Sequence, residues 1–121
     1  MNKARSTHAV IAFNEKVYAF GGYNGTRMRN AECFDIEEGA WNELQDMPRE
    51  CSFVNAAING CRIFITGFSM GTILEFNPMN NSYYELEIAI PRDVNKGIIA
   101  TPSSLLIVTA NDVCYESDYT G

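Results

Sequence analysis

Histidine and basic side chains are scarce in this chain of 121 residues, which has one histidine, His8, and nine Lys and Arg against fifteen Asp and Glu. The formal net charge of -6 argues against nucleic-acid partners, because a phosphate-binding surface needs a basic patch. One histidine is poor material for a copper or zinc site, and the run of aspartates typical of calcium loops is missing. We therefore expect no metal and no cofactor.

Long hydrophobic runs are also missing. The longer apolar runs, such as Ala9 to Phe13 and Leu105 to Val108, have the length of a strand, whereas a membrane helix needs about 20 such residues. Residues 1–5 lack the apolar core of a secretory signal. These absences predict no membrane partner and a cytoplasmic location.

Catalytic motifs are not found either. No nucleophile motif frames a serine, and the segment Gly21-Gly22-Tyr23-Asn24-Gly25 is not followed by the Lys-Ser/Thr of a phosphate loop. His8 lies in a predicted inner strand, where we interpret it as a structural residue rather than as a base or a metal ligand. The chain is predicted not to be an enzyme.

The cysteines contain no Cys-x-x-Cys pair, and without a secretion signal disulfides are not expected to persist. We expect free, reduced and mostly buried thiols at Cys33, Cys51, Cys61 and Cys114. Two glycosylation sequons begin at Asn24 and Asn80, and both are interpreted as turns.

The feature that the sequence does contain is an internal repeat. Arg5, Arg49 and Arg92 recur at spacings of 44 and 43 residues, and each is followed by an apolar stretch. Further segments match at similar offsets: 17–22 with 63–67, 32–35 with 74–77, and 40–44 with 82–86. The repeats predict three units, at residues 1–48, 49–91 and, as a partial copy, 92–121.

Each unit is expected to form four short strands. Apolar runs of strand length alternate with turn residues such as Asn59-Gly60, and no segment shows a sustained helical period. A repeat of about 40 to 50 residues with four strands is typical of a β-propeller blade. The predicted fold class is all-β, with four-stranded antiparallel blades. Closed propellers use roughly four to eight blades, so further blades are expected from a longer chain or from self-association.

The first unit resembles the kelch repeat. The residues that carry the resemblance are Arg5, Tyr18, Gly21-Gly22, Tyr23-Asn24-Gly25, Phe34-Asp35, Trp41, Leu44 and Met47-Pro48. The second unit has Thr66-Gly67 in place of the double glycine and Tyr83 in place of the tryptophan, and the third has Thr109-Ala110 where the glycines should be. The resemblance covers essentially the whole chain and implies a partial kelch-type β-propeller, whose ring this chain alone does not close.

Five of these residues are predicted to be structural. Glycine at the end of a strand permits a positive φ and a close approach of neighbouring backbone, and Thr66 can replace it only where a less extreme conformation suffices. The aromatic ring of the fourth strand offers a large apolar area, which we expect to be buried against the next blade. The structural candidates are Gly21, Gly22, Gly67, Trp41 and Tyr83.

The resemblance also implies a ligand face, because kelch propellers commonly meet their ligands at the loops on one face of the disc. Carried over by position, the candidates are Arg5, Tyr23, Asn24, Arg49, Phe68, Ser69 and Arg92. Since arginine binds carboxylates through a bidentate fork, the expected ligand is a protein or peptide of acidic character. The alternative is that these arginines pair with neighbouring acids, such as Glu50 or Asp93, and stabilise the junctions between blades.

The function that the resemblance implies is a non-enzymatic protein-interaction module. The finer expectation is the substrate-recognition part of an adaptor for a cullin-based ubiquitin ligase. The alternatives are a cytoskeletal, actin-binding scaffold and, with less support, part of a propeller enzyme such as a galactose-oxidase-like oxidase or a sugar-acid mutarotase. The copper enzyme needs several His and Tyr ligands, which His8 alone does not supply.

Overall fold

The computed structural model describes residues 5–68, 70–86, 97–100, 104–108 and 113–118. These residues form β-strands and turns, as the lack of helical periodicity predicts, and no helix among them is long and apolar enough to cross a bilayer. The strands are β1 (Ala9–Phe13), β2 (Lys16–Phe20), β3 (Ala31–Asp35), β4 (Ala40–Glu43), β5 (Asn55–Asn59), β6 (Arg62–Thr66), β7 (Leu74–Asn77), β8 (Ser82–Glu85), β9 (Gly97–Ala100), β10 (Ser104–Val108) and β11 (Val113–Asp118).

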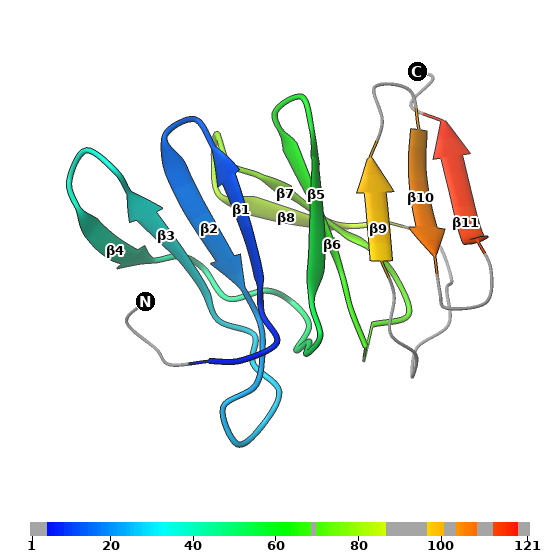
Figure 1. The fold of residues 1–121 in the computed structure, drawn as a ribbon, viewed down its shortest axis with the longest axis horizontal. Helices are drawn as coiled ribbons and strands as arrows, with labels where there is room; N and C mark the ends of the chain where they lie inside the picture. The colour runs from blue at the N-terminus through cyan, green and yellow to red at the C-terminus, as the bar shows by residue number, and fades with distance from the viewer. Residues whose placement is uncertain (1–4, 69, 87–96, 101–103, 109–112, 119–121) are drawn as a thin grey trace.

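The strands form three antiparallel sheets that stand side by side (Figure 1). Two sheets have four strands each, in the orders β1-β2-β3-β4 and β5-β6-β7-β8, and the third has the order β11-β10-β9. The first strands of consecutive sheets lie against one another, β1 against β5 and β5 against β9. This is the arrangement of propeller blades around an axis, so the all-β fold class and the open, partial ring are confirmed. The predicted repeat boundaries after residues 48 and 91 stay predictions, and the second lies outside the described residues.

Tight turns set the register of the hairpins. Asn14 and Glu15, between β1 and β2, have φ angles of 53° and 60°, and Gly60, between β5 and β6, has a φ of 61°. Positive φ at both central residues, as in the first turn, or at the first central residue alone, as in the second, matches the right-handed twist of the two strands that the turn joins. The turns predicted at Asn14-Glu15-Lys16 and Asn59-Gly60 therefore lie where the sequence placed them.

An aromatic cluster joins the first two sheets. Tyr18 and Phe20, two residues apart on β2, point to the same side of their sheet. The ring of Phe76 on β7 meets them edge-on, with centroid distances of 5.6 Å to Tyr18 and 5.2 Å to Phe20. Phe20 and Phe76 are fully buried. Strands that are apolar on both faces can bury the second face only against another sheet, which explains why the repeats stack.

The prediction that Trp41 is buried against the next blade is wrong. Trp41 pairs with Phe34 in the ladder, and its ring contacts the Phe34 ring at 5.3 Å, on the face of the first sheet that points away from the second. Tyr83, at the corresponding position, packs on Phe76 at 5.0 Å and donates a hydrogen bond of 2.9 Å to the carbonyl of Gln45. The aromatic residue of the fourth strand therefore covers the preceding sheet, and Trp41 is left half-buried.

The aromatic cluster should dominate the stability of the chain. Replacing a fully buried Phe by Ala removes apolar contacts and leaves a cavity, so we expect Phe76→Ala to lower the free energy of unfolding by about 3 to 5 kcal/mol. Met79→Ala, at a side chain that is 74% exposed, is the control and should change it by less than about 0.5 kcal/mol. Urea denaturation followed by circular dichroism measures both, and equal losses in the two variants would contradict the placement of Phe76.

Candidate functional site

The double glycine joins three segments on one side of the sheets. Gly22 has a φ of 111°, and a Cβ at this position would lie 2.6 Å from the carbonyl oxygen of Ser6. Its N–H donates to the carbonyl of Cys51, and its own carbonyl accepts from the N–H of Met28. The segment before β1, the β2–β3 loop and the β4–β5 segment therefore meet at Gly22, where any side chain would separate them.

The second sheet has Thr66 and Gly67 at the positions of the double glycine. Thr66 is fully buried, does not have a positive φ, and donates its hydroxyl to the carbonyl of Thr72 at 3.0 Å. A threonine fits here because the less extreme backbone conformation suffices, as expected. Position 67 still requires glycine because the segment at Cys51 and Ser52 lies close to it. A Cβ there would contact the Cys51 thiol and would lie 2.9 Å from the Ser52 carbonyl.

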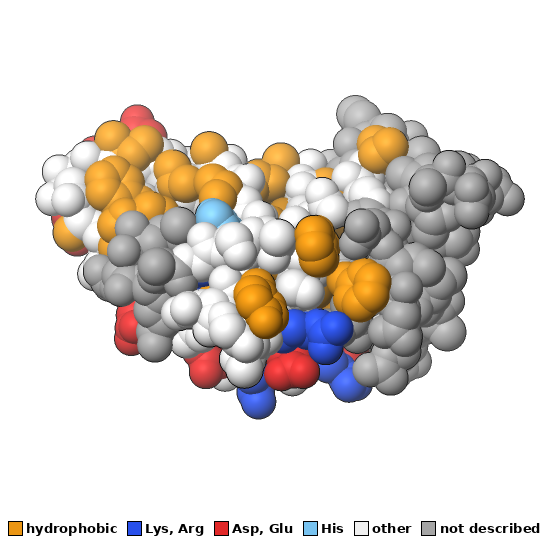
Figure 2. All heavy atoms as spheres, turned by 60° about the horizontal axis from the view of Figure 1, so that its bottom comes forward, with side chains coloured by type: hydrophobic (Ala, Val, Ile, Leu, Met, Phe, Trp, Pro, Cys, Tyr) orange, Lys and Arg blue, Asp and Glu red, His pale blue; other side chains and the backbone are white. Residues whose placement is uncertain are grey.

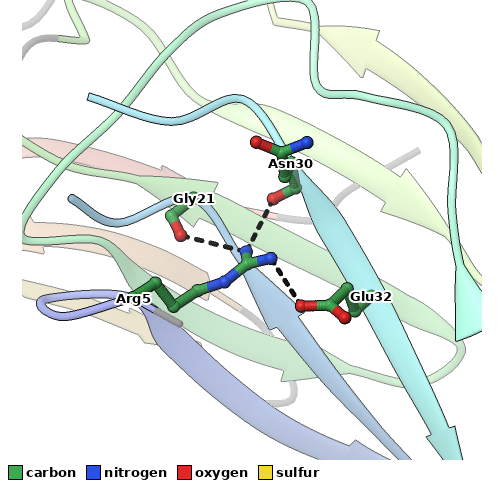
Figure 3. Close-up of polar contacts among 4 residues, drawn as sticks. All are labelled: Arg5, Gly21, Asn30 and Glu32. Atoms are coloured by element: carbon green, nitrogen blue, oxygen red, sulfur yellow. Dashed lines mark hydrogen bonds and ion pairs between the residues drawn. The ribbon is translucent and has the colours of Figure 1, made fainter. Parts of the chain in front are cut away.

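Arg5 is part of a buried ion pair and does not face a ligand. Its guanidinium donates to Glu32 Oε2 at 2.6 Å and to the carbonyls of Gly21 and Asn30 at 3.1 and 3.0 Å (Figure 3). Both side chains of the ion pair have no exposed surface. A buried charge is tolerated only when it is paired and hydrogen-bonded, so Arg5 and Glu32 depend on each other.

The corresponding arginine of the second sheet makes a weaker, exposed pair. Arg49 donates to Glu85 at 2.7 Å, and the two side chains are 55% and 37% exposed. Leu74 occupies the position that matches Glu32, so Arg49 bonds to an acid on the outer strand instead. For Arg5 and Arg49 the structure thus shows pairing, although neither partner is Glu50. Arg92 lies outside the described residues, as does Ser69.

Beside the double glycine lies a pocket of about 680 Å³. Its wall comes from the segment before β1, the β2–β3 loop, the β4–β5 segment and the β6–β7 loop, all on the side of the molecule that is lowest in Figure 1. Figure 2 turns this side toward the viewer and shows hydrophobic side chains next to Lys and Arg, with Asp and Glu beside them. The lining residues are Ser6, Thr7, Tyr23, Thr26, Arg27, Glu50, Ser52, Phe53 and Phe68.

Aromatic rings and one cation define the chemistry of this pocket. Phe53 and Phe68 meet edge-on at 6.3 Å, and the guanidinium of Arg27 lies 5.6 Å from the centre of the Phe68 ring. This cation–π contact places the guanidinium of Arg27, an exposed residue, against the apolar face of the Phe68 ring. Phe53 and Tyr23 are about half exposed, at 51% and 48%. The pocket can therefore take an apolar group beside a carboxylate.

Two residues of the pocket wall have strained backbones. Thr7 and Phe53 have φ angles of 53° and 47°, a region that costs energy for residues other than glycine. The two strained stretches are linked, because the N–H of Val54 donates to the carbonyl of Thr7 at 2.9 Å. The hydroxyl oxygen of Thr7 is buried and has no hydrogen-bond partner. Strain of this kind persists only where the surrounding structure fixes the backbone.

The structure brings together only part of the predicted ligand face. Tyr23 and Phe68 line the pocket, and Asn24 lies in an adjoining hollow of about 310 Å³. Sequence reasoning missed Arg27 and Phe53. The spacing of 44 residues between Arg5 and Arg49 matches Phe53 with Ala9, the first residue of β1, whereas β5 begins two residues later, at Asn55. Arg27 lies three residues after Asn24 in a loop whose course the sequence does not predict.

His8 and the cysteines are the other chemically reactive side chains that the sequence analysis considered. Burial and the neighbouring Arg5 guanidinium lower the pKa of His8 below its ordinary value, although Glu32 acts in the opposite direction. The described residues include no group of three or more His, Cys, Asp or Glu that could hold a metal ion. Cys33 and Cys51 are buried and Cys61 is exposed, and none of these three cysteines forms a disulfide.

Known proteins share this repeat. The family model of the Kelch motif matches residues 4–48, which cover the first sheet, Arg5 and the double glycine. Residues 4–48 of the chain form a kelch repeat. Kelch-like protein 7 of Rattus norvegicus is 26% identical over 126 residues, which cover 99% of this chain and 20% of that protein.

Shorter matches reach higher identity. Kelch repeat and BTB domain-containing protein 2 of Cowpox virus (strain GRI-90 / Grishak) is 36% identical over 67 residues, or 54% of this chain and 12% of that protein. Alpha-scruin of Limulus polyphemus is 32% identical over 69 residues, or 55% of this chain and 8% of that protein. This kelch chain thus spans about a fifth or less of the length of these relatives.

The buried pair of the first kelch sheet gives a double-mutant prediction. Arg5→Met leaves the Glu32 carboxylate buried without its cation and should lower the free energy of unfolding by about 3 to 5 kcal/mol. Adding Glu32→Leu copies Leu74 of the second sheet and should restore at least half of the loss. Urea denaturation of both single variants and the double variant measures this coupling, and additive losses would contradict it.

The histidine gives a pH prediction. Because the folded state lowers the pKa of His8, the unfolded state binds the proton first as the pH falls below the ordinary value of about 6.5. Stability should therefore fall between about pH 7 and pH 5, and it should fall less in His8→Gln, which has no imidazole to protonate. Urea midpoints at several pH values test this, and parallel pH profiles for the two proteins would refute it.

Proposed function

We propose that this kelch segment is a non-enzymatic protein-interaction module that binds a peptide in the pocket beside the double glycine. The observation that carries the proposal is the placement of Arg27 over Phe68, next to the rings of Phe53 and Tyr23. The relatives with kelch repeats support an interaction module at this coarser level.

The pocket favours a ligand with one acidic residue next to an apolar side chain. A carboxylate can take two hydrogen bonds from the guanidinium of Arg27, and the apolar neighbour can bury its surface against the aromatic rings. Glu50 lines the same pocket. The negative charge of Glu50 repels any ligand carboxylate beyond the one that Arg27 binds. The pocket should therefore bind a peptide with a single acidic residue better than one with an acidic run.

The net charge of the chain predicts how the association rate of such a peptide depends on salt. The net charge of -6 repels an acidic ligand at long range, while Arg27 attracts it only at contact. Association should therefore be slow at low salt and faster where salt screens the repulsion. This differs from a basic face, whose binding of acidic ligands weakens as salt is added.

We further propose, from the kelch resemblance, that the whole protein recognises substrates for a cullin-based ubiquitin ligase. The name of the Cowpox virus relative says that it contains kelch repeats and a BTB domain. The same combination is expected in the ligase adaptors that the kelch resemblance suggests. An actin-binding role, raised by the same resemblance, and a cytoplasmic location, expected from the sequence, also belong to the proposals. Co-sedimentation with filamentous actin and binding to a purified cullin separate the two roles.

A peptide-binding experiment tests the pocket. The probe is a pool of fluorescein-labelled octapeptides that carry one Glu flanked by Phe or Leu, with a matched pool in which Gln replaces Glu. Fluorescence anisotropy should show tighter binding of the Glu pool. Arg27→Gln should weaken binding of that pool at least tenfold and remove the preference for Glu over Gln, since it deletes the charged donor.

The control variant removes an arginine elsewhere. Arg62, at the opposite end of its strand from the β6–β7 loop, is 61% exposed and lies 3.6 Å from Glu75. Arg62→Gln changes the net charge by the same amount and should leave peptide binding unchanged. Equal losses in Arg27→Gln and Arg62→Gln would mean that only overall charge matters, and absence of binding by either pool would overturn the proposal.

A further inference from the structure

The polar hollow that adjoins the aromatic pocket contains a second arginine of the β2–β3 loop. This hollow, of about 310 Å³, is lined by Asn24, residues 26–30 and Asp46. Thr26 and Arg27 also line the aromatic pocket, so the two depressions share one wall. Arg29 lies two residues after Arg27, and both arginines are exposed. A ligand bound in the pocket through Arg27 therefore has a second guanidinium within the next depression.

Arg27 and Arg29 differ from the other arginines that the structure describes, because neither is part of an ion pair. Arg5, Arg49 and Arg62 pair with glutamates at 2.6, 2.7 and 3.6 Å. Within the described part of the chain, no such pair includes Arg27 or Arg29. A chain with fifteen acidic and nine basic residues has acids in excess. Two arginines without an acidic partner, two residues apart, are thus open to an anion from outside.

The backbone between these two arginines is fixed. Met28 is buried, its N–H donates to the carbonyl of Gly22 at 2.9 Å, and its own carbonyl accepts from the N–H of Cys51 at 3.1 Å. Arg29 is held as well, because its Nε donates to the carbonyl of Met47 at 3.3 Å. In extended backbone, residues two apart place their side chains on the same side, with Cα atoms about 6.5 Å apart. The two guanidiniums are therefore neighbours before any ligand binds.

Two neighbouring guanidiniums suit a phosphoryl group better than a carboxylate. A carboxylate has two oxygens, and the fork of one guanidinium can bind both of them. The side chain of phosphoserine or phosphothreonine has three strong acceptor oxygens and carries a charge of about -1.5 to -2 at pH 7. When Arg27 binds two of these oxygens, the third is left for Arg29.

We propose that the anionic residue of the ligand is a phosphorylated serine or threonine, whose phosphoryl group bridges Arg27 and Arg29. The apolar neighbour of that residue then enters the aromatic pocket, so this inference rests on the proposed peptide binding there. The peptide becomes a ligand once a kinase has transferred a phosphoryl group from a nucleoside triphosphate to its hydroxyl. Phosphorylation of the partner therefore controls when this module binds it.

Charge favours a phosphopeptide over a nucleic acid as the source of the phosphoryl group. A nucleic acid brings a phosphate with every nucleotide, and the net charge of -6 repels such a polymer. Asp46 lies in the hollow, where its carboxylate opposes a further negative charge. One phosphoryl group beside an apolar side chain is thus the form of phosphate that the site accommodates.

Three pools of fluorescein-labelled octapeptides test this inference with the whole chain. The pools carry phosphoserine, Glu or Ser, each flanked by Phe or Leu. Fluorescence anisotropy at about pH 7.5 should show binding of the phosphoserine pool at least tenfold tighter than that of the Glu pool, and weakest binding of the Ser pool. Equal affinities for phosphoserine and Glu would overturn this inference and leave the proposed function standing, whereas no binding of any pool would overturn both.

The ratio of the two affinities separates the roles of the two arginines. Arg29→Gln should reduce the preference for phosphoserine over Glu from at least tenfold to about twofold, because it removes the second cation. Arg27→Gln should weaken both pools at least tenfold. The control Arg62→Gln changes the net charge by the same amount and should keep the preference. An equal fall in Arg29→Gln and Arg62→Gln would mean that phosphoserine responds only to the overall charge, which would contradict the bridge.

Asp46 provides a variant that leaves both arginines in place. Asp46→Asn removes the opposing carboxylate and should tighten binding of the phosphoserine pool at least threefold, with a smaller gain for the Glu pool. Glu37→Gln changes the net charge equally at an exposed residue of the β3–β4 turn, outside both depressions, and is the matched control. Equal gains in the two variants would count against a phosphoryl group in the hollow.

Inorganic phosphate distinguishes a peptide site from a site for free phosphate. Because inorganic phosphate has no apolar neighbour to bury in the aromatic pocket, it should displace the phosphoserine pool only at concentrations at least a hundredfold above the Kd of the peptides. Displacement near that Kd would assign the two arginines to free phosphate and overturn the phosphopeptide.

Discussion

The first two sheets carry apolar residues on both faces, and the need to bury them determines most of the structure. A sheet that is solvated on one side can place polar residues there, but the three central residues of β2 and of β6 are all apolar. Burying both faces requires a neighbour on each side, so the sheets stack in a row and their first strands lie together. The contact of Phe76 with Tyr18 and Phe20 is where this requirement is met most completely.

The stacking also decides where a ligand can bind. The second strands of the first two sheets, β2 and β6, run in the same direction. The β2–β3 and β6–β7 loops therefore lie on one side of the molecule. Gly22 lets the segment before β1 approach these loops, and the buried Arg5–Glu32 pair holds that segment in place. The aromatic pocket is thus assembled from loops of both sheets, with little contribution from the strands themselves.

The sequence predicted those features of the molecule that recur regularly along the chain. The repeat of the arginines, the alternation of apolar runs with turns, and the double glycine were sufficient for the all-β fold, and the kelch resemblance implied that Tyr23 and Phe68 lie on one face. The sequence did not predict which face of the sheet Trp41 occupies, because period-two alternation distinguishes two faces without saying which neighbour each one meets.

The pocket residues were harder to predict for a different reason. The 44-residue spacing matches Phe53 with Ala9, the first residue of β1, but Phe53 has a positive φ and lies before β5 begins. Arg27 depends on the path of an irregular loop, which no periodicity encodes. Arg5 was predicted to face a ligand or to pair with a neighbouring acid, but its partner Glu32 is 27 residues away, and the second repeat has a leucine there.

The location of the pocket at a junction has a mechanical consequence. Tyr23 and Arg27 belong to the first sheet and Phe68 to the second, so the distance between cation and ring is set by the angle at which the two sheets pack. Any event that tilts one sheet against the other would open or close the pocket without touching its residues. A partner that covers the face of the first sheet beside Trp41 would therefore affect the distance between Arg27 and Phe68 through the packing of the two sheets.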